Sequence, residues 1–381
     1  MRILFVIDKM INYAGIERIL SCKMNYISEQ TTHQVFLTTY EQRTIDLPFQ
    51  LNSRILYQPM DALMPQWGKD TLAGWLKNYI QARCLFRQQF RQLLKDTTPD
   101  IVICTVYSFQ VLDIIINTSC KQRIKTIMES HTKGETVTFG NKAKYNPLLY
   151  RLISLWDWHI MKSLKRCQSV VTLTKQDIPF WKNYAPRIEV IPNMLTIMPQ
   201  KVRSYEKKRV ISAGRYMSEK GFDRLLKAWY LLGQQFCDWH LYIFGNGDRR
   251  PYEKIVDQLK LTSTVHLMSA TDNIAEEFSK SSIYVMSSRY EGFGLVLAEA
   301  MSCGLPCVSF DCPYGPREII ANGEDGLLAE DGNIEDLAQK IENLMSDSKL
   351  RATMGEKAQI NIARYAPETI MKMWIKLFQN I

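Results

Sequence analysis

Short runs of apolar, often β-branched residues alternate with longer segments of helical period along the chain. In the first half these runs are RILFVI, HQVFLTTY, DIVICTV, IKTIMES, SVVTLT and IEVIPN. Their length is that of buried strands, and the segments between them repeat apolar residues with a helical spacing. Strands that alternate with helices favour a parallel sheet with crossover helices. The first half therefore predicts a doubly wound α/β sheet.

The pattern is interrupted between Pro192 and Pro199 and by the charged segment KVRSYEKKR, and it restarts near Lys207. The runs RVISAGR, HLYIFGNG, TVHLMS, IYVMSS and PCVSF follow, then a helix from about Ile334 and an amphipathic C-terminal segment. We predict Rossmann-like domains at 1–200 and 201–360, and a helix at 361–381 that packs back toward the first domain. Two facing sheets place their strand ends on either side of one cleft, where we expect the function.

Composition fits a soluble two-domain protein of 381 residues, with 46% hydrophobic and 23% charged residues. The best candidate for a membrane span is broken by Ser108, Gln110 and Asp113. The N-terminus lacks the pattern of a signal peptide, so we expect a cytoplasmic protein. The nine cysteines favour reduced core thiols, and the spacing of Cys303, Cys307 and Cys312 does not favour a metal site.

Charge is concentrated in the first half of the chain. Residues 1–200 carry 25 Lys and Arg against 15 Asp and Glu, whereas the remainder carries 23 against 24. An excess of this kind indicates either an anionic partner, such as phospholipid head groups or nucleic acid, or a surface that only aids solubility.

The segment WLKNYIQARCLFRQQFRQLLK combines cations and aromatic residues at helical spacing. One interpretation is a helix that lies on the anionic inner face of the cytoplasmic membrane. The other is a helix that packs its aromatic residues inward and leaves its arginines in solvent. The residues concerned are Arg83, Arg87, Arg91, Tyr79, Phe86 and Phe90.

Two loops of the second half have the composition of a phosphate site. In AGRYMSEKGFDRLLKAW, Arg215 and Lys220 stand between a strand end and a helix that opens near Phe222, which suits a dianion such as a diphosphate. Surface charges around a turn are the alternative. In FGNGDRR, Gly245 allows a tight turn, but a lone G-x-G is weak evidence. The third glycine of a dinucleotide fingerprint is missing, so a nicotinamide cofactor is disfavoured.

The stretch SRYEGFGLVLAEAMSCG places two carboxylates around the start of an apolar helix. The free N–H groups of the first turn, near Phe293, Gly294 and Leu295, can bind an anion. Glu299 lies one turn further on and can accept hydrogen bonds from two vicinal hydroxyls, and Glu291 can do so for a sugar. The alternative is that both acids are solvated surface charges.

These motifs together resemble the retaining GT-B glycosyltransferases of family 4. The resemblance is carried by G-R-x4-K-G from Gly214, by G-N-G at Gly245 and by E-G-F-G-L-V-L-A-E followed by A-M-S-C-G-L-P. The segments DCPYGPREII and NGEDGLL resemble the subgroup that builds bacterial exopolysaccharide, capsule and lipopolysaccharide. The resemblance covers the whole chain in outline, and its most specific part is the pair Glu291 and Glu299.

The resemblance implies a role for each matching residue. Arg215 and Lys220 would neutralise the donor diphosphate, Glu299 would bind the ribose hydroxyls and Glu291 would touch the donor sugar. Gly15 would pack against the donor from the first domain. His131 in MESHTKGE matches a histidine near the transferred sugar, although a structural role for His131 is equally open.

We therefore expect a retaining hexosyltransferase that uses a nucleoside-diphosphate sugar, with UDP favoured, and a glycan or polyprenyl-diphosphate-linked acceptor. No D-x-D motif occurs, so we expect no metal. We also expect no cofactor and no nucleic-acid partner. Arg215, Lys220 and the helix N–H groups would stabilise the leaving diphosphate instead. The alternatives are a nucleotide-sugar epimerase or phosphorylase of the same architecture, and a sugar-binding scaffold protein without turnover.

Overall fold

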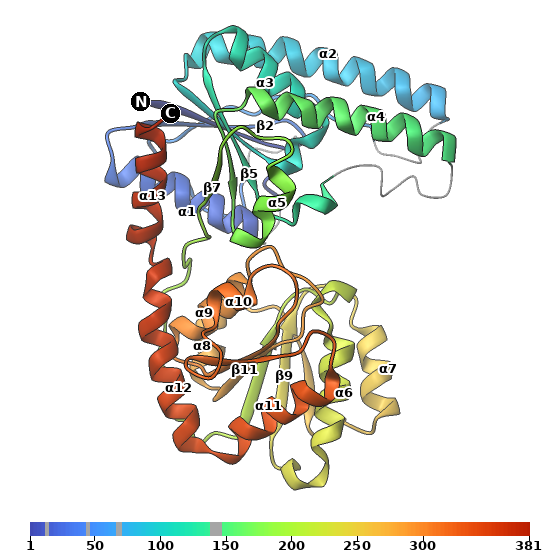
Figure 1. Cartoon of the computed structure of the whole chain (residues 1–381), viewed down its shortest axis with the longest axis vertical. Coiled ribbons are helices and arrows are strands. Elements are labelled where there is room, and N and C mark those ends of the chain that lie inside the picture. The colour runs from blue at the N-terminus through green and yellow to red at the C-terminus, as the bar shows by residue number, and fades with distance from the viewer. Residues whose placement is uncertain (12–14, 43–45, 66–70, 138–146) are drawn as a thin grey trace. The chain divides into compact units, whose positions relative to one another are not determined.

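The computed structural model describes residues 1–11, 15–42, 46–65, 71–137 and 147–381. The chain divides into two compact units. The first unit comprises Met1–Pro192 and Ile370–Ile381, and the second unit is the continuous segment Asn193–Thr369. Each unit is built around one parallel sheet with helices on both faces (Figure 1), which confirms the predicted pair of Rossmann-like domains.

The first unit holds a sheet of seven strands in the order β3-β2-β1-β4-β5-β6-β7. Its central strands are buried along nearly their whole length, which explains their continuous apolar sequences. The two-residue edge strand β3 was not predicted because so short a strand has no periodicity. The strands are β1 (Arg2–Ile7), β2 (Gln34–Thr39), β3 (Leu56–Tyr57), β4 (Ile101–Thr105), β5 (Lys125–Ser130), β6 (Ser169–Thr172) and β7 (Ile188–Val190).

Helices cover both faces of this sheet (Figure 1). One face carries α2, α3 and α4, and the other carries α1 and α13. The helices are α1 (Gly15–Gln30), α2 (Leu72–Thr97), α3 (Leu112–Lys121), α4 (Pro147–Ser163), α5 (Ile178–Trp181) and α13 (Pro367–Gln379). The C-terminal helix contacts α1, because the Lys23 ammonium lies 3.9 Å from the centre of the Trp374 ring.

The aromatic residues of α2 pack inward. Tyr79, Phe86 and Phe90 are buried, which confirms the interpretation in which the aromatic residues pack inward and contradicts the one in which they meet a membrane. Arg83 is buried with them and lies 2.6 Å from Asp113 of α3. Its guanidinium also donates to the Gln110 carbonyl. The prediction that all three arginines are solvated is therefore wrong for Arg83.

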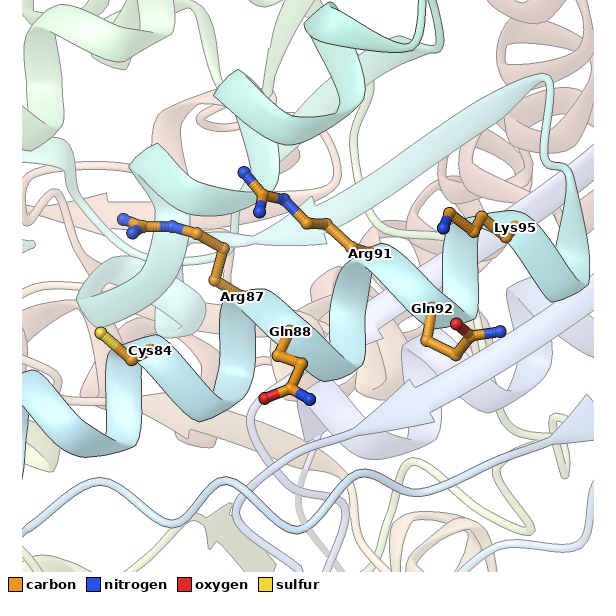
Figure 2. A pocket seen from close by; sticks show the side chains of 6 residues that line it. All are labelled: Cys84, Arg87, Gln88, Arg91, Gln92 and Lys95. Atoms are coloured by element: carbon orange, nitrogen blue, oxygen red, sulfur yellow. The ribbon is translucent and has the colours of Figure 1, made fainter.

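Arg87 and Arg91, which follow Arg83 at four-residue spacing on α2, are exposed. They line a shallow groove of about 310 Å³ along α2 (Figure 2). None of the residues in the second-half motifs lines this groove. Its lining residues are Cys84, Arg87, Gln88, Arg91, Gln92 and Lys95.

The second unit holds a sheet of six strands in the order β10-β9-β8-β11-β12-β13. The strands are β8 (Arg209–Ala213), β9 (His240–Gly245), β10 (Val265–Ser269), β11 (Ile283–Met286), β12 (Cys307–Phe310) and β13 (Gly326–Ala329). The helices are α6 (Phe222–Leu232), α7 (Arg250–Gln258), α8 (Ile274–Ser279), α9 (Leu295–Ser302), α10 (Pro316–Ile319), α11 (Ile334–Ser346) and α12 (Ser348–Asn361). The edge strand β13 was not predicted.

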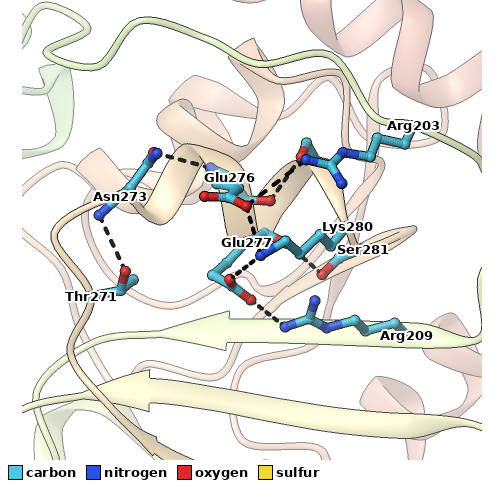
Figure 3. Close-up of polar contacts among 9 residues, drawn as sticks. Arg203, Arg209, Thr271, Asn273, Glu276, Glu277, Lys280 and Ser281 are labelled. Carbon is cyan, nitrogen blue, oxygen red and sulfur yellow. Dashed lines mark hydrogen bonds and ion pairs between the residues drawn. The ribbon is translucent and has the colours of Figure 1, made fainter.

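An ion-pair network holds the segment that enters the second unit (Figure 3). The backbone N–H of Arg203 donates to the Ser279 carbonyl at 2.9 Å. Glu277 of α8 accepts from Arg209 of β8 at 2.5 Å and from Lys280 at 2.8 Å. The segment before β8 is therefore fixed against α8. Within the described residues, no helix combines the length and apolar character needed to cross a membrane.

The buried Arg83–Asp113 pair makes a testable prediction about stability. Replacing Arg83 by Met leaves the Asp113 carboxylate without its cation in a buried site, and the expected cost is about 3–5 kcal/mol of unfolding free energy. Arg87→Met is the matched control, because Arg87 lies one turn further along α2 and is exposed; its expected effect is within about 0.5 kcal/mol. Urea unfolding at neutral pH measures both, and equal losses would contradict the assignment.

Candidate functional site

The loops that follow β8 and β9 meet at one edge of the second sheet. The Gly214 N–H donates to the Phe244 carbonyl at 2.9 Å. A Cβ atom on Gly245 would lie only 1.9 Å from the Gly214 carbonyl oxygen. Only glycine therefore fits at this position without a backbone shift. Gly245, which sequence reasoning could assign only weakly, shapes the loop that carries Arg215 and Lys220.

Arg289 fixes the turn that carries Lys220. Its guanidinium donates to both carboxylate oxygens of Asp223 at 2.8 Å and to the Ser218 carbonyl at 2.6 Å. The hydrogen bonds from Arg289 lower the pKa of Asp223. The Ser287 hydroxyl donates to the Lys220 carbonyl at 2.9 Å. The turn is thus held from two sides by the segment after β11, and Arg289 was not predicted.

Lys220 and Glu291 meet directly. The Lys220 ammonium lies 2.7 Å from a Glu291 carboxylate oxygen, and the same oxygen accepts from the Ser288 hydroxyl at 2.6 Å. Glu291 is therefore not a solvated turn residue. Sequence reasoning assigned these two residues to separate parts of the ligand, and it did not predict their contact. Arg215 is exposed, and no ion pair of Arg215 is found within the described part of the chain.

The helix α9 begins as predicted, just after the E-G-F-G turn. Gly294 precedes it with φ +96°, and the first helical bond runs from the Ala298 N–H to the Gly294 carbonyl at 3.1 Å. Phe293 is buried, and a Cβ atom on Gly315 would lie 2.0 Å from the Phe293 carbonyl oxygen. The loop after β12 therefore packs tightly on the turn. The N–H groups of residues 295–297 precede the first helical bond and lack helical partners, as at any helix start.

Glu299 is buried on the second turn of α9. Its side chain is 1% exposed, and one carboxylate oxygen accepts from the Thr196 hydroxyl at 2.8 Å. The alternative that Glu299 is a surface charge is therefore wrong. A buried carboxylate that accepts from a hydroxyl has the chemistry needed to hold a hydroxyl of a ligand. The contribution of Thr196 was not predicted, because it comes from the segment before β8, more than a hundred residues earlier.

His131 lies in the first unit, at the end of β5, and is buried. Its Nε2 atom is 3.0 Å from Glu129, which also lies 2.5 Å from the Lys23 ammonium. Burial alone raises the pKa of Glu129, but the charge of Lys23 and the hydrogen bond and charge of His131 outweigh burial and lower it to about 2. Gly15, the remaining predicted residue, is exposed at the start of α1. Lys23 and Glu129 had no role in the sequence prediction.

The predicted residues thus fall into two groups. Residues of the phosphate and hydroxyl motifs surround the strand ends of the second unit, whereas Gly15 and His131 belong to the first unit. Among the described residues, no group of three or more His, Cys, Asp or Glu side chains is arranged to hold a metal ion.

Comparison with known proteins finds a family match within the second unit. The family described as "Glycosyl transferases group 1" matches residues 194–360. An uncharacterized glycosyltransferase of Haemophilus influenzae is 34% identical over 212 residues, which are 55% of this chain and 60% of that protein. The chain therefore spans less than two thirds of that relative.

Two further comparisons extend beyond the matched domain. The amylovoran biosynthesis glycosyltransferase AmsD of Erwinia amylovora is 26% identical over 390 residues, which cover 98% of each chain. The crystal structure of S. aureus TarM, solved with fondaparinux, alpha-GlcNAc-glycerol and UDP, is similar with a TM-score of 0.66 and 25% identity. This likeness covers 78% of the present chain and 59% of TarM. The two parallel sheets are those of the GT-B fold.

The contacts of Arg289 predict that its replacement lowers the unfolding free energy and loosens the turn that carries Lys220. We expect Arg289→Met to lower the unfolding free energy by about 1 kcal/mol, because a two-point ion pair at a partly exposed site is lost. Arg224→Met is the control, since Arg224 follows Asp223 on α6 and pairs with Asp331 at the longer distance of 3.4 Å. Urea unfolding and amide hydrogen exchange at residues 218–221 measure the effect. Unchanged exchange in Arg289→Met would show that the turn does not depend on Arg289.

Proposed function

We propose that this chain, which carries a group 1 glycosyltransferase domain over residues 194–360, transfers a hexose-type sugar from a nucleoside-diphosphate sugar to a bacterial surface glycan. One observation carries the proposal. The cationic loop after β8 and helix α9, with its free first turn and the buried carboxylate of Glu299, follow strands of one sheet at the same edge. This combination suits the diphosphate and the hydroxyls of one ligand. Relatives in bacterial polysaccharide synthesis support the assignment.

The donor is proposed to be a UDP sugar. Arg215, Lys220 and the N–H groups at the start of α9, after Phe293 and Gly294, would bind the diphosphate. Glu299 would hold the ribose hydroxyls, with Gly245 shaping the neighbouring loop. UDP is preferred over GDP because the similar TarM structure was solved with UDP.

The proposed reaction breaks the bond between the sugar and the diphosphate. The cations would stabilise the charge that develops on the leaving diphosphate, so a divalent metal is not part of the proposal. Glu291, already fixed by Lys220 and Ser288, would orient the donor sugar and not attack it. His131 would lie near the transferred sugar. The acceptor hydroxyl would attack the sugar carbon on the face that the diphosphate leaves and would pass its proton to the leaving diphosphate, which would give retention of configuration, as in family 4.

The acceptor is proposed to be a glycan or a glycan on a polyprenyl diphosphate. The first unit, which would select it, carries 27 Lys and Arg against 15 Asp and Glu over Met1–Pro192 and Ile370–Ile381. Such a charge suits an anionic acceptor at the inner face of the cytoplasmic membrane. Gly15 would approach the donor from this unit.

A thermal-shift series tests the nucleotide and the metal together. UDP, GDP and ADP are added with and without EDTA, since a ligand that binds only the folded protein raises its Tm. We expect UDP to raise the Tm by the same amount in both conditions. Loss of the shift with EDTA would contradict metal independence, and the absence of any nucleotide shift would contradict the site. Release of UDP from UDP sugars then separates an enzyme from a binding protein.

Variants of the two acids should separate binding from turnover. Glu299→Ala is expected to weaken UDP binding by about tenfold or more, because charged hydrogen bonds to the ribose are lost. Glu291→Ala is expected to lower kcat by about a hundredfold with a smaller effect on UDP affinity, because the sugar loses its orientation. Calorimetry with UDP and steady-state kinetics measure the two effects. Glu324→Ala, at an exposed turn, is the control, and wild-type behaviour of both site variants would refute the roles.

A further inference from the structure

The outward side of α4 carries large apolar side chains in solvent. Leu155 is 65% exposed and Trp158 is 57% exposed. Arg151 and Lys162 are exposed on the same stripe, because positions 151, 155, 158 and 162 recur at helical spacing. The Lys162 ammonium lies 4.8 Å from the centre of the Trp158 ring. The helix α4 therefore presents to solvent an apolar strip that is bordered by cations.

The neighbouring helix α2 also exposes apolar side chains. Leu76 and Ile80 are 49% and 54% exposed, and they lie on the same stripe of α2 as Arg83. Arg83 in turn lies under the Trp156 ring of α4, 4.9 Å from its centre. The exposed apolar residues of α2 are therefore on the side of that helix that adjoins α4, and Figure 1 shows the two helices on the same face of the sheet.

The charge of both helices is almost entirely positive. Each helix has one acidic residue in its sequence. Asp157 of α4 is buried, and Asp96 of α2 lies in the last turn, far from Leu76 and Ile80. Arg87 of α2 is also exposed, and it lies one turn beyond Arg83 on the stripe that holds Leu76 and Ile80.

We propose that this face docks on an anionic phospholipid surface. We call it the docking face and define it by Leu76, Ile80, Leu155 and Trp158 with Arg151 and Lys162. Leu155 and Trp158 would enter the boundary between head groups and acyl chains, where Trp is favoured, and the cations would contact lipid phosphates. The residues differ from the buried aromatic stripe of α2 that sequence reasoning selected for this role.

The cations of the docking face favour a lipid surface over a second copy of the chain as its binding partner. A twofold contact through this face would bring Arg151 and Lys162 close to the same cations of the other copy, without exposed acids on α4 to offset them. An anionic bilayer satisfies the apolar strip and its cationic border at once. The inference goes beyond the proposed transfer reaction and rests on this surface alone.

Vesicle co-sedimentation of the full chain tests the docking face. The probes are phosphatidylcholine vesicles with and without phosphatidylglycerol. We expect binding to the anionic vesicles that weakens with added salt. The double variant with Leu155→Asp and Trp158→Asp is expected to lose about tenfold or more in partition, since burial of two large apolar side chains is removed. Arg151→Gln with Lys162→Gln should lose several-fold on anionic vesicles only.

Ile360→Asp is the matched control, because Ile360 is 72% exposed on α12 of the second unit and lies outside the docking face. Thermal unfolding and UDP binding show whether each variant is folded, and UDP binding also reports on the proposed site independently of lipid. Wild-type partition of the folded double variant would overturn the proposal. So would a dimer in solution that this double variant dissociates, because the occupant would then be a second copy.

Discussion

Close approach of backbone to backbone at the strand ends of the second sheet is the constraint on which the candidate site depends. Gly245 lies against the Gly214 carbonyl, and Gly315 lies against the Phe293 carbonyl, at distances that leave no room for a Cβ atom. These contacts place the cationic loop and the start of α9 at one edge. Hydrogen bonds from Arg289 and Ser287 then fix the turn of Lys220. The candidate site has few polar side chains, and these backbone contacts hold the segments that carry them.

The first unit is organised by buried charge. Lys23, Glu129 and His131 form one cluster beneath the C-terminal helix, and Arg83 and Asp113 form another between α2 and α3. A buried ion pair contributes little net stability compared with an apolar pair, but removal of one partner is costly. The first cluster joins α1 to β5, and the second joins α2 to α3. The Glu129 carboxylate, with its low pKa, keeps a negative charge beside His131 over the physiological pH range.

Sequence patterns were sufficient for the elements and for part of the site. The long apolar runs predicted the central strands, and the start of α6 at Phe222 and of α11 at Ile334 followed from their helical period. The edge strand β3 was missed because two residues carry no periodicity, and β13 was missed because its run GLLA is short, lacks β-branched residues and begins with glycine. Local motifs identified Lys220, Glu291 and Glu299. Partners from distant segments, such as Thr196 for Glu299 or Lys23 for Glu129, depend on tertiary packing and leave no local signal.

The division of the chain has a consequence for its synthesis. The second unit is one continuous segment, Asn193–Thr369, whereas the first unit needs Ile370–Ile381 as well as Met1–Pro192. Trp374 closes over Lys23 only when those last residues are present. During synthesis, the second unit therefore has all of its sequence before the first unit has, although the first unit begins earlier. The segment that covers the buried Lys23 is the part of the first unit that is made last.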